Sequence, residues 1–128
     1  MHEEEIADCL CLMLESIKLI ESRFQQVGSP GEFVQSSEGT TLLDAIVMRL
    51  QVIGESVRKI QKMVFSFLHL YSDVEWDKIA RFRDLVSHHY DHVDHEIVYD
   101  ICKVHIPALK LTLQKVHSDL SAPDGNQP

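Results

Sequence analysis

The chain has 128 residues, enough for one domain that buries roughly two-thirds of its unfolded surface. Apolar residues make up 45% and charged residues 25%, an ordinary globular composition that excludes a chain disordered throughout. The formal net charge of -8 excludes a protein that coats nucleic acid through its overall charge, because phosphate binding needs a positive field. Lys and Arg nevertheless gather in two segments, residues 49–62 and 78–83, so a local basic site stays open.

The acidic start of the chain differs from the basic start of a secretory signal, and no apolar run approaches the ~18 residues of a membrane span. We therefore expect a cytoplasmic protein with no membrane segment. Three cysteines are an odd number, and Cys9 and Cys11 point in different directions on a helix. Reduced thiols with packing roles are expected.

Apolar residues recur at helical spacing from Ile6 to Val27, which predicts an amphipathic helix that Gly28 ends. Residues 29–39 are rich in turn formers and are predicted to form a loop. A second apolar stripe predicts a long helix over residues 42–70, with Thr40 or Thr41 as its cap. Gly54 lies inside this helix, either because another backbone approaches closely there or because the glycine is merely tolerated.

Ser72 or Asp73 can cap a third helix, which buries one face that begins at Trp76 and fades near His88. A fourth helix is predicted to begin around Asp94. Pro107 disfavours helical geometry at Ile106, so two helices should meet near His105 and Ile106, the second ending near Leu120. The predicted fold is an all-α, up-and-down bundle of four to five helices in one domain, residues 1–120, with a disordered tail at residues 121–128.

The segment RDLVSHHY, residues 83–90, brings an arginine, two histidines and a tyrosine together on an acidic chain. On a continuous helix Arg83 and His88 would be ~140° apart. If the helix ends near His88 and the chain becomes extended, His88 and Tyr90 point the same way, and the long Arg83 side chain can reach them. A guanidinium can bind phosphate oxygens in pairs, and an imidazole can transfer protons near neutral pH. These three residues together indicate metal-free phosphate chemistry.

Two other interpretations stay open from the residues alone. In the first, Arg83 is a solvated side chain or an ion-pair partner of Asp84 or Asp91, and the histidines are simply packed. In the second, imidazoles and carboxylates between His88 and His95 are metal ligands.

The sequence resembles the HepT-like proteins of the HEPN superfamily, whose hallmark R-x4-H-x-Y reads here Arg83-x4-His88-x-Tyr90. Trp76 and Ile79 stand where these proteins have W-x-x-I-x-x-x-R. Residues 49–55 look like the family's R-x-x-x-x-G-E helix, and residues 106–109 like its L-P-x-L entry to the final helix. The resemblance runs from about Glu3 to Leu120.

The resemblance implies a homodimeric toxin of a toxin–antitoxin module, with a metal-independent endoribonuclease site that acts on tRNA or mRNA and needs no cofactor. By position, Arg83 would bind the phosphate, His88 would be the acid or base, and Tyr90 would accept AMP from a cognate minimal nucleotidyltransferase, the antitoxin. That modification would make the chain a phosphoprotein and block the site. Glu55 is expected to be structural or to orient a cation.

One departure lies beside the motif. The family's arginine is usually followed by asparagine, whereas here Asp84 follows, and its carboxylate can pair with Arg83 or alter phosphate binding. The alternative is a catalytically silent HEPN module that binds nucleotide or protein and assembles with a nucleotidyltransferase.

Overall fold

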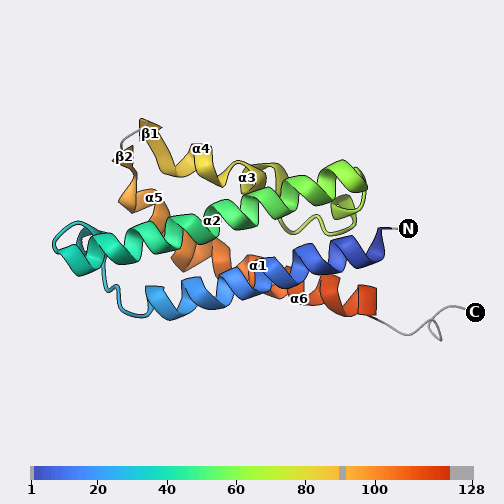
Figure 1. Ribbon diagram of the computed structural model, residues 1–128, viewed down its shortest axis with the longest axis horizontal. Coiled ribbons are helices and arrows are strands. Elements are labelled where there is room, and N and C mark those ends of the chain that lie inside the picture. Colours follow the sequence, from blue (N-terminus) through green and yellow to red (C-terminus); the bar gives the residue numbers. More distant parts are fainter. Residues whose placement is uncertain (1, 90–91, 122–128) are drawn as a thin grey trace, which may run out of the picture.

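Three long helices form the body of the protein (Figure 1). In the computed structural model, which describes residues 2–89 and 92–121, α1 runs over Glu3–Phe24, α2 over Ser37–Met63 and α6 over Ile106–Ser121. The shorter elements are η1 (Pro30–Phe33), η2 (Leu68–Leu70), α3 (Trp76–Ala80), α4 (Phe82–Val86), β1 (Ser87–His89), β2 (His92–Val93), α5 (His95–Asp100) and the π-helical turn η3 (Ile101–His105). The predicted all-α bundle is confirmed.

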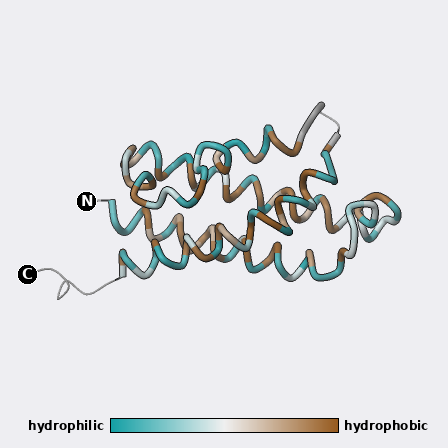
Figure 2. The backbone as a smooth tube through the Cα atoms, turned by 180° about the vertical axis from the view of Figure 1, so that it is seen from behind, coloured by the Kyte–Doolittle hydropathy of each residue, from teal (hydrophilic) through white to brown (hydrophobic). Residues whose placement is uncertain are grey.

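Helix α1 packs against α2 and α6, and α3 and α4 pack against α2. The hydrophobic core is one cluster of buried side chains, to which α3, α4 and α5 contribute as well as the three long helices. Figure 2 shows hydrophobic and hydrophilic segments alternating along the long helices, as amphipathic helices require. The predicted apolar stripes supply the buried side chains of α1 and α2. These are chiefly Ile6, Leu10, Met13, Ile17, Ile20, Leu43, Ile46, Leu50, Ile53, Val57 and Ile60.

The first connection is shorter and more helical than the predicted loop over residues 29–39. Helix α1 ends at Phe24, Pro30–Phe33 forms a 3₁₀ turn, and α2 already begins at Ser37. The predicted Thr40 or Thr41 cap is wrong, because the Ser36 hydroxyl accepts the bond from the Gly39 N–H at 3.0 Å. Gly39 is required inside the helix, since a Cβ there would overlap the carbonyl oxygen of Glu32.

Helix α2 ends at Met63 rather than near Leu70. Apolar residues continue beyond Met63, but Val64 adopts an extended backbone, and of the residues in the following 3₁₀ turn only Leu68 is buried. The apolar pattern therefore extends beyond the C-terminal end of the helix that it predicted.

The predicted third helix is two short helices, α3 and α4, separated at Arg81. Neither Ser72 nor Asp73 caps it: α3 follows Glu75, whose side chain makes no capping bond. The indole N–H of Trp76 instead donates to the carbonyl of Tyr71 at 2.8 Å and fixes the entry to α3. The predicted buried side is confirmed at Trp76, Ile79, Phe82 and Val86, whereas Leu85 is half-buried.

The predicted start at Asp94 is confirmed, because its carboxylate accepts from the N–H groups of Glu96 and Ile97 at 3.1 and 3.0 Å. The junction at His105 and Ile106 is also confirmed, as the π turn η3 ends and α6 begins there. The predicted loss of helical geometry at Ile106 is wrong, since its φ of -64° and ψ of -44° are helical. The wider π turn accommodates Pro107, which has no N–H to donate.

Within the described ranges, no helix combines the length and the apolar character needed to cross a membrane. Seven of the eight residues of the predicted tail, 122–128, lie outside the described residues, and Ser121 is the last residue of α6.

The contact between α2 and α3 depends on Gly54. A Cβ at this position would lie 3.1 Å from the carbonyl oxygen of Ile79 and 3.2 Å from that of Ala80. Both oxygens belong to backbone at the C-terminal end of α3 and cannot swing away as a side chain can. The predicted close approach of another backbone is confirmed.

We expect Gly54→Ala to lower the free energy of unfolding by on the order of 1 kcal/mol, measured by urea denaturation. Alanine favours the helix by about 1 kcal/mol, but pushing α3 away from α2 costs more, roughly 1–3 kcal/mol. Gly31→Ala is the matched control, because its Cβ would meet only the flexible end of Gln35. A Gly54→Ala protein more stable than wild type would contradict this account of the contact.

Candidate functional site

The predicted motif lies where α4 passes into a small hairpin. Phe82 and Val86 are buried and anchor α4, while Arg83 and Asp84 between them are exposed. The helix ends at Val86, and Ser87–His89 continue as the extended strand β1. The predicted change from helix to extended chain near His88 is therefore confirmed.

Strand β1 pairs with β2 in antiparallel register, Ser87 opposite Val93 and His89 opposite His92, with an irregularity between the two pairs. The N–H of Asp94 donates to the carbonyl of Val86 at 2.6 Å, at the base of the hairpin. This ladder was not predicted, because a segment of two or three residues is too short to show a strand period. The backbone of His88 lies in the middle of β1, and Tyr90 lies outside the described residues.

The Asp84 carboxylate was a predicted ion-pair partner of Arg83. Both side chains are described, and no ion pair joins them. Among the described residues, Arg83 has neither a hydrogen bond nor an ion pair, so its guanidinium faces solvent. Consecutive helical residues point ~100° apart, which separates the two groups and leaves the cation available.

Glu55 is exposed on α2, next to the glycine that contacts α3. It forms no ion pair with any residue the structure describes, so a role in orienting a cation remains a prediction. A metal at His88–His95 also remains a prediction, because Tyr90 and Asp91 are outside the described residues. Elsewhere in the described chain, no three His, Cys, Asp or Glu side chains stand close enough to hold a metal ion.

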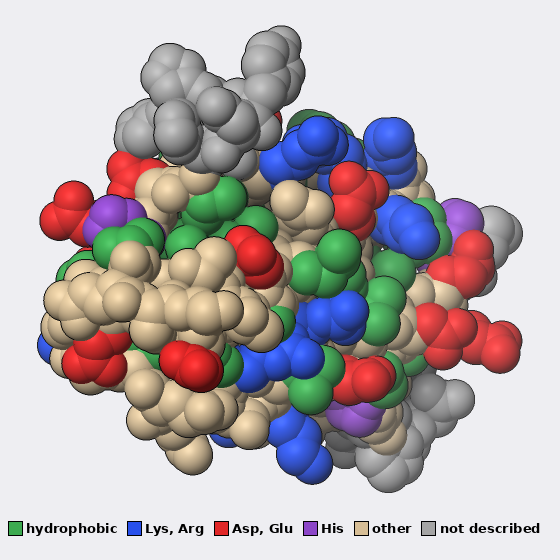
Figure 3. All heavy atoms as spheres, turned by 60° about the vertical axis from the view of Figure 1, so that its left-hand side comes forward, with side chains coloured by type: hydrophobic (Ala, Val, Ile, Leu, Met, Phe, Trp, Pro, Cys, Tyr) green, Lys and Arg blue, Asp and Glu red, His purple; other side chains and the backbone are tan. Residues whose placement is uncertain are grey.

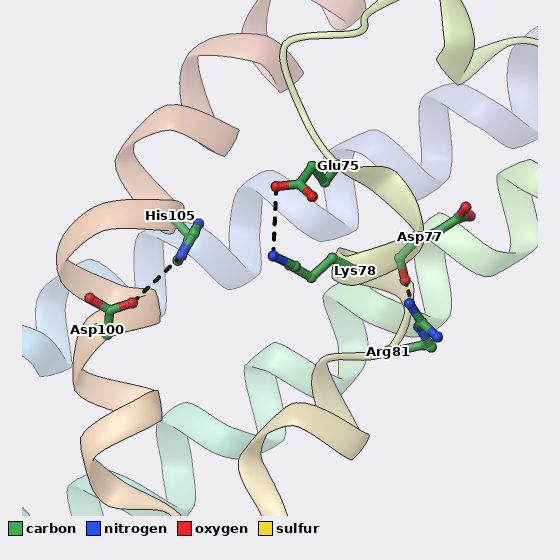
Figure 4. Close-up of polar contacts among 6 residues, drawn as sticks. All are labelled: Glu75, Asp77, Lys78, Arg81, Asp100 and His105. Atoms are coloured by element: carbon green, nitrogen blue, oxygen red, sulfur yellow. Dashed lines mark hydrogen bonds and ion pairs between the residues drawn. The ribbon is translucent and has the colours of Figure 1, made fainter.

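A cavity of about 250 Å³ lies beneath α4, between α3 and the helical run α5–η3–α6. Its floor is apolar, and the side chains of Phe82 and Leu85 reach it from α4. Two polar pairs stand on opposite sides of its rim (Figure 4): the Lys78 Nζ lies 3.6 Å from the Glu75 Oε1, and the His105 Nε2 lies 3.6 Å from the Asp100 Oδ2.

Sequence reasoning missed the Asp100 and His105 pair. Residues five apart diverge on an α-helix, but the π turn between them bonds each residue to the fifth along and brings them together. The only signal in the sequence was Pro107, which indicated an irregular turn without indicating its type.

Among the groups whose side chains the structure describes, Tyr71 and Cys102 have clearly raised pKa values, and both lie away from α4. Burial, together with a 2.7 Å bond to Asp119, raises the pKa of Tyr71 to about 12, so this phenol ties the loop after α2 to α6 as a neutral donor. Burial also raises the pKa of Cys102 to about 12, as expected for a packed thiol. The three cysteines are free, as predicted, but Cys11 is exposed and its Sγ lies 3.8 Å from the Nε2 of His117.

Several known proteins similar to this chain are named as ribonucleases. A protein named "Gamma-glutamylcyclotransferase and putative RNase" from Methanocaldococcus jannaschii is 29% identical over 115 residues, 90% of this chain and 49% of that protein. A "Putative RNase" of the same organism is 32% identical over 82 residues, 64% of this chain and 65% of its own length. A "Probable ribonuclease HepT" from Thermococcus cleftensis is 32% identical over 72 residues, 56% of this chain and 63% of its own.

The chain thus spans about half to two thirds of the length of these curated relatives. No solved structure matches it. Residues 13–116 match the family model described as "Ribonuclease HepT-like", a range that contains α2 to α5, the hairpin and most of α1 and α6. The chain belongs to the HepT-like ribonuclease family.

Proposed function

We propose that this chain is the toxin of a toxin–antitoxin module and acts as a metal-independent endoribonuclease on tRNA or mRNA. Its antitoxin is a cognate minimal nucleotidyltransferase, which blocks the site by transferring AMP from ATP to Tyr90. Membership of the HepT-like ribonuclease family supports the ribonuclease chemistry. Three further parts of the proposal rest on the R-x4-H-x-Y motif: the toxin role, the partner and the modification.

The observation that carries the proposal is the end of α4 at Val86. Arg83 stands exposed on the last turn of this helix, and the backbone of His88 follows within the extended strand β1. A helix continued through His88 would have turned the two residues away from each other. The change to extended chain supports a shared site at this end of the helix.

The proposed chemistry is cleavage by the adjacent ribose hydroxyl. The His88 imidazole takes the proton of a 2′-hydroxyl, whose oxygen attacks phosphorus while the bond to the 5′-oxygen breaks. The Arg83 guanidinium donates paired hydrogen bonds to the phosphoryl oxygens as their negative charge grows. The leaving oxygen needs a proton, and a homodimer could supply the acid from the second subunit's motif.

Tyr90 is the proposed AMP acceptor. It follows His88 by two residues in the sequence, so an adenylyl group on its phenol would bring bulk and a negative phosphate close to His88 along the chain. Repulsion between that phosphate and the RNA backbone would then block the site. In this transfer the Tyr90 phenol oxygen loses its proton and bonds to the α-phosphorus of ATP, while the bond from that phosphorus to the leaving pyrophosphate breaks.

The alternative function is a catalytically silent module that binds nucleotide or protein and assembles with a nucleotidyltransferase. Asp84 favours it, because an exposed carboxylate beside Arg83 repels phosphate where the family usually has a neutral asparagine. The exposed, unpaired state of Arg83 among the described residues favours the nuclease instead. Binding to the antitoxin does not distinguish the two functions, because both include it. RNA cleavage does distinguish them, because only the nuclease cuts RNA.

We expect wild-type protein to cleave tRNA or mRNA in EDTA, and His88→Ala to be slower by about 10²-fold or more, because a general acid–base group is removed. His89→Ala, the same change at the next position of β1, is the control and should retain cleavage. Denaturing gels of purified RNA give the rates.

Equal residual cleavage by wild type and His88→Ala would refute His88 as the proton-transfer group. Cleavage abolished by EDTA would support the metal interpretation of His88–His95. A folded wild-type protein that leaves all RNA intact would support the silent module.

We expect co-expression with a cognate nucleotidyltransferase to add the mass of one AMP to the chain, observed by intact-mass spectrometry. Tyr90→Phe should lose the adduct, because the accepting oxygen is gone, and Tyr99→Phe should keep it. An adduct that persists in Tyr90→Phe would show that the acceptor is another residue.

A further inference from the structure

Three arginines, Arg58, Arg81 and Arg83, are associated with the segment where α3 passes into α4. The Nη2 of Arg58, on α2, donates to the carbonyl of Ala80 at 3.1 Å, which places this guanidinium beside the peptide bond between Ala80 and Arg81. Arg83 follows two residues later, one turn from the hairpin. All three side chains are exposed.

The guanidiniums of Arg58 and Arg81 bond to backbone carbonyls rather than to carboxylates. The Nε of Arg81 donates to the Asp77 carbonyl at 3.3 Å (Figure 4), while the Asp77 carboxylate accepts from Gln61 at 3.0 Å. In the part of the chain that the structure describes, none of the three arginines has an ion-pair partner. Lysines elsewhere do: Lys110 lies 3.1 Å from Glu21.

Arginines without ion-pair partners are unexpected in a chain that has more acidic than basic residues. With 20 acidic and 12 basic residues, carboxylates are in excess, yet none of these three arginines has an ion-pair partner among the described residues. Mutual repulsion of these cations opposes folding, and a neutral donor such as glutamine could satisfy the Ala80 carbonyl equally well. Packing therefore does not explain why the positions carry guanidiniums.

The free N–H groups indicate what the cluster binds. A guanidinium has five donors, and Arg58 and Arg81 each use one, so paired hydrogen bonds to phosphate oxygens remain available. Figure 3 shows Lys and Arg side chains gathered on one face of the molecule, with carboxylates interspersed. A flexible single strand can place its phosphates at the cations and avoid those carboxylates, whereas a rigid duplex presents charge across the whole face.

We infer that Arg58 and Arg81 join Arg83 in a cluster that holds backbone phosphates of single-stranded RNA beside the bond to be cut. The inference rests on the proposed function. It adds two RNA-binding residues, Arg58 and Arg81, that lie outside the R-x4-H-x-Y motif. Arg58 also satisfies the last carbonyl of α3, so it positions the turn that presents the other two arginines.

The test is a binding titration with a short, labelled 2′-O-methyl oligouridylate, which lacks the attacking hydroxyl and cannot be cut. Fluorescence anisotropy at several NaCl concentrations gives the dependence of log K on log salt. Each of Arg58→Gln and Arg81→Gln should lower the magnitude of that slope by ~0.7, the value for one phosphate contact on a single strand. Lys115→Gln, the same charge change on the exposed face of α6, should leave the slope unchanged.

Thermal unfolding separates binding from folding. Arg81→Gln removes only a bond within its own turn and should melt as wild type does; Arg58→Lys keeps the charge and should keep the slope. Wild-type slopes in both glutamine variants, an equal loss in Lys115→Gln, or tighter binding of duplex DNA of the same length would overturn the inference. The expected slopes in a protein that cuts no unmodified RNA would overturn the nuclease proposal and leave the phosphate cluster standing.

Discussion

The approach of α3 to α2 at Gly54 is the constraint on which the end of the molecule with the proposed site depends. A glycine inside a helix costs about 1 kcal/mol relative to alanine, and here it allows the carbonyls of Ile79 and Ala80 to lie against α2. Trp76 and Ile79 become buried in exchange. One turn along α2, Arg58 donates to the Ala80 carbonyl, which has no partner within its own helix.

The break at Arg81 follows from this contact. With its last carbonyls turned toward α2, α3 stops after five residues, and α4 restarts with Phe82 buried. Helix α4 is equally short and would not be stable alone. Buried Val86 and the bond from the Asp94 N–H to the Val86 carbonyl hold its end, and Asp94 also caps α5. The strands are thus anchored on both sides by elements that pack into the core.

The sequence predicted best what depends on periodic apolar burial. The stripes of α1 and α2, the cap at Asp94 and the close approach at Gly54 all correspond to local patterns that the structure confirms. It predicted poorly where an element ends because of a distant contact. Gly39 looked like part of a turn, yet it lies inside α2 because the Glu32 carbonyl occupies the space of a side chain. The π turn was equally hidden, since apolar spacing does not distinguish it from an α-helical turn.

At the site, the roles of Arg83, His88 and Tyr90 remain predictions from the motif. The end of the helix near His88 was predicted, and α4 ends at Val86; a solvated Arg83 was one of the interpretations left open, and the side chain is exposed. The pairing of Arg83 with Asp84 was an open expectation that the structure does not bear out, because neighbouring helical positions diverge. Arg58 was noted only as part of a basic segment. Its place beside Arg81 depends on the packing of α2 against α3, which no local pattern encodes.

The central claim is that Arg83 acts on the phosphate as it reacts, and the single-turnover cleavage rate of Arg83→Gln in EDTA tests it most directly. The account predicts a rate about 10²-fold or more below wild type, because a donor to the growing negative charge is lost. Binding of the uncleavable oligonucleotide should weaken far less than the rate falls. If the cleavage rate and the binding affinity fell by the same factor, Arg83 would only bind RNA, and this result would contradict the account.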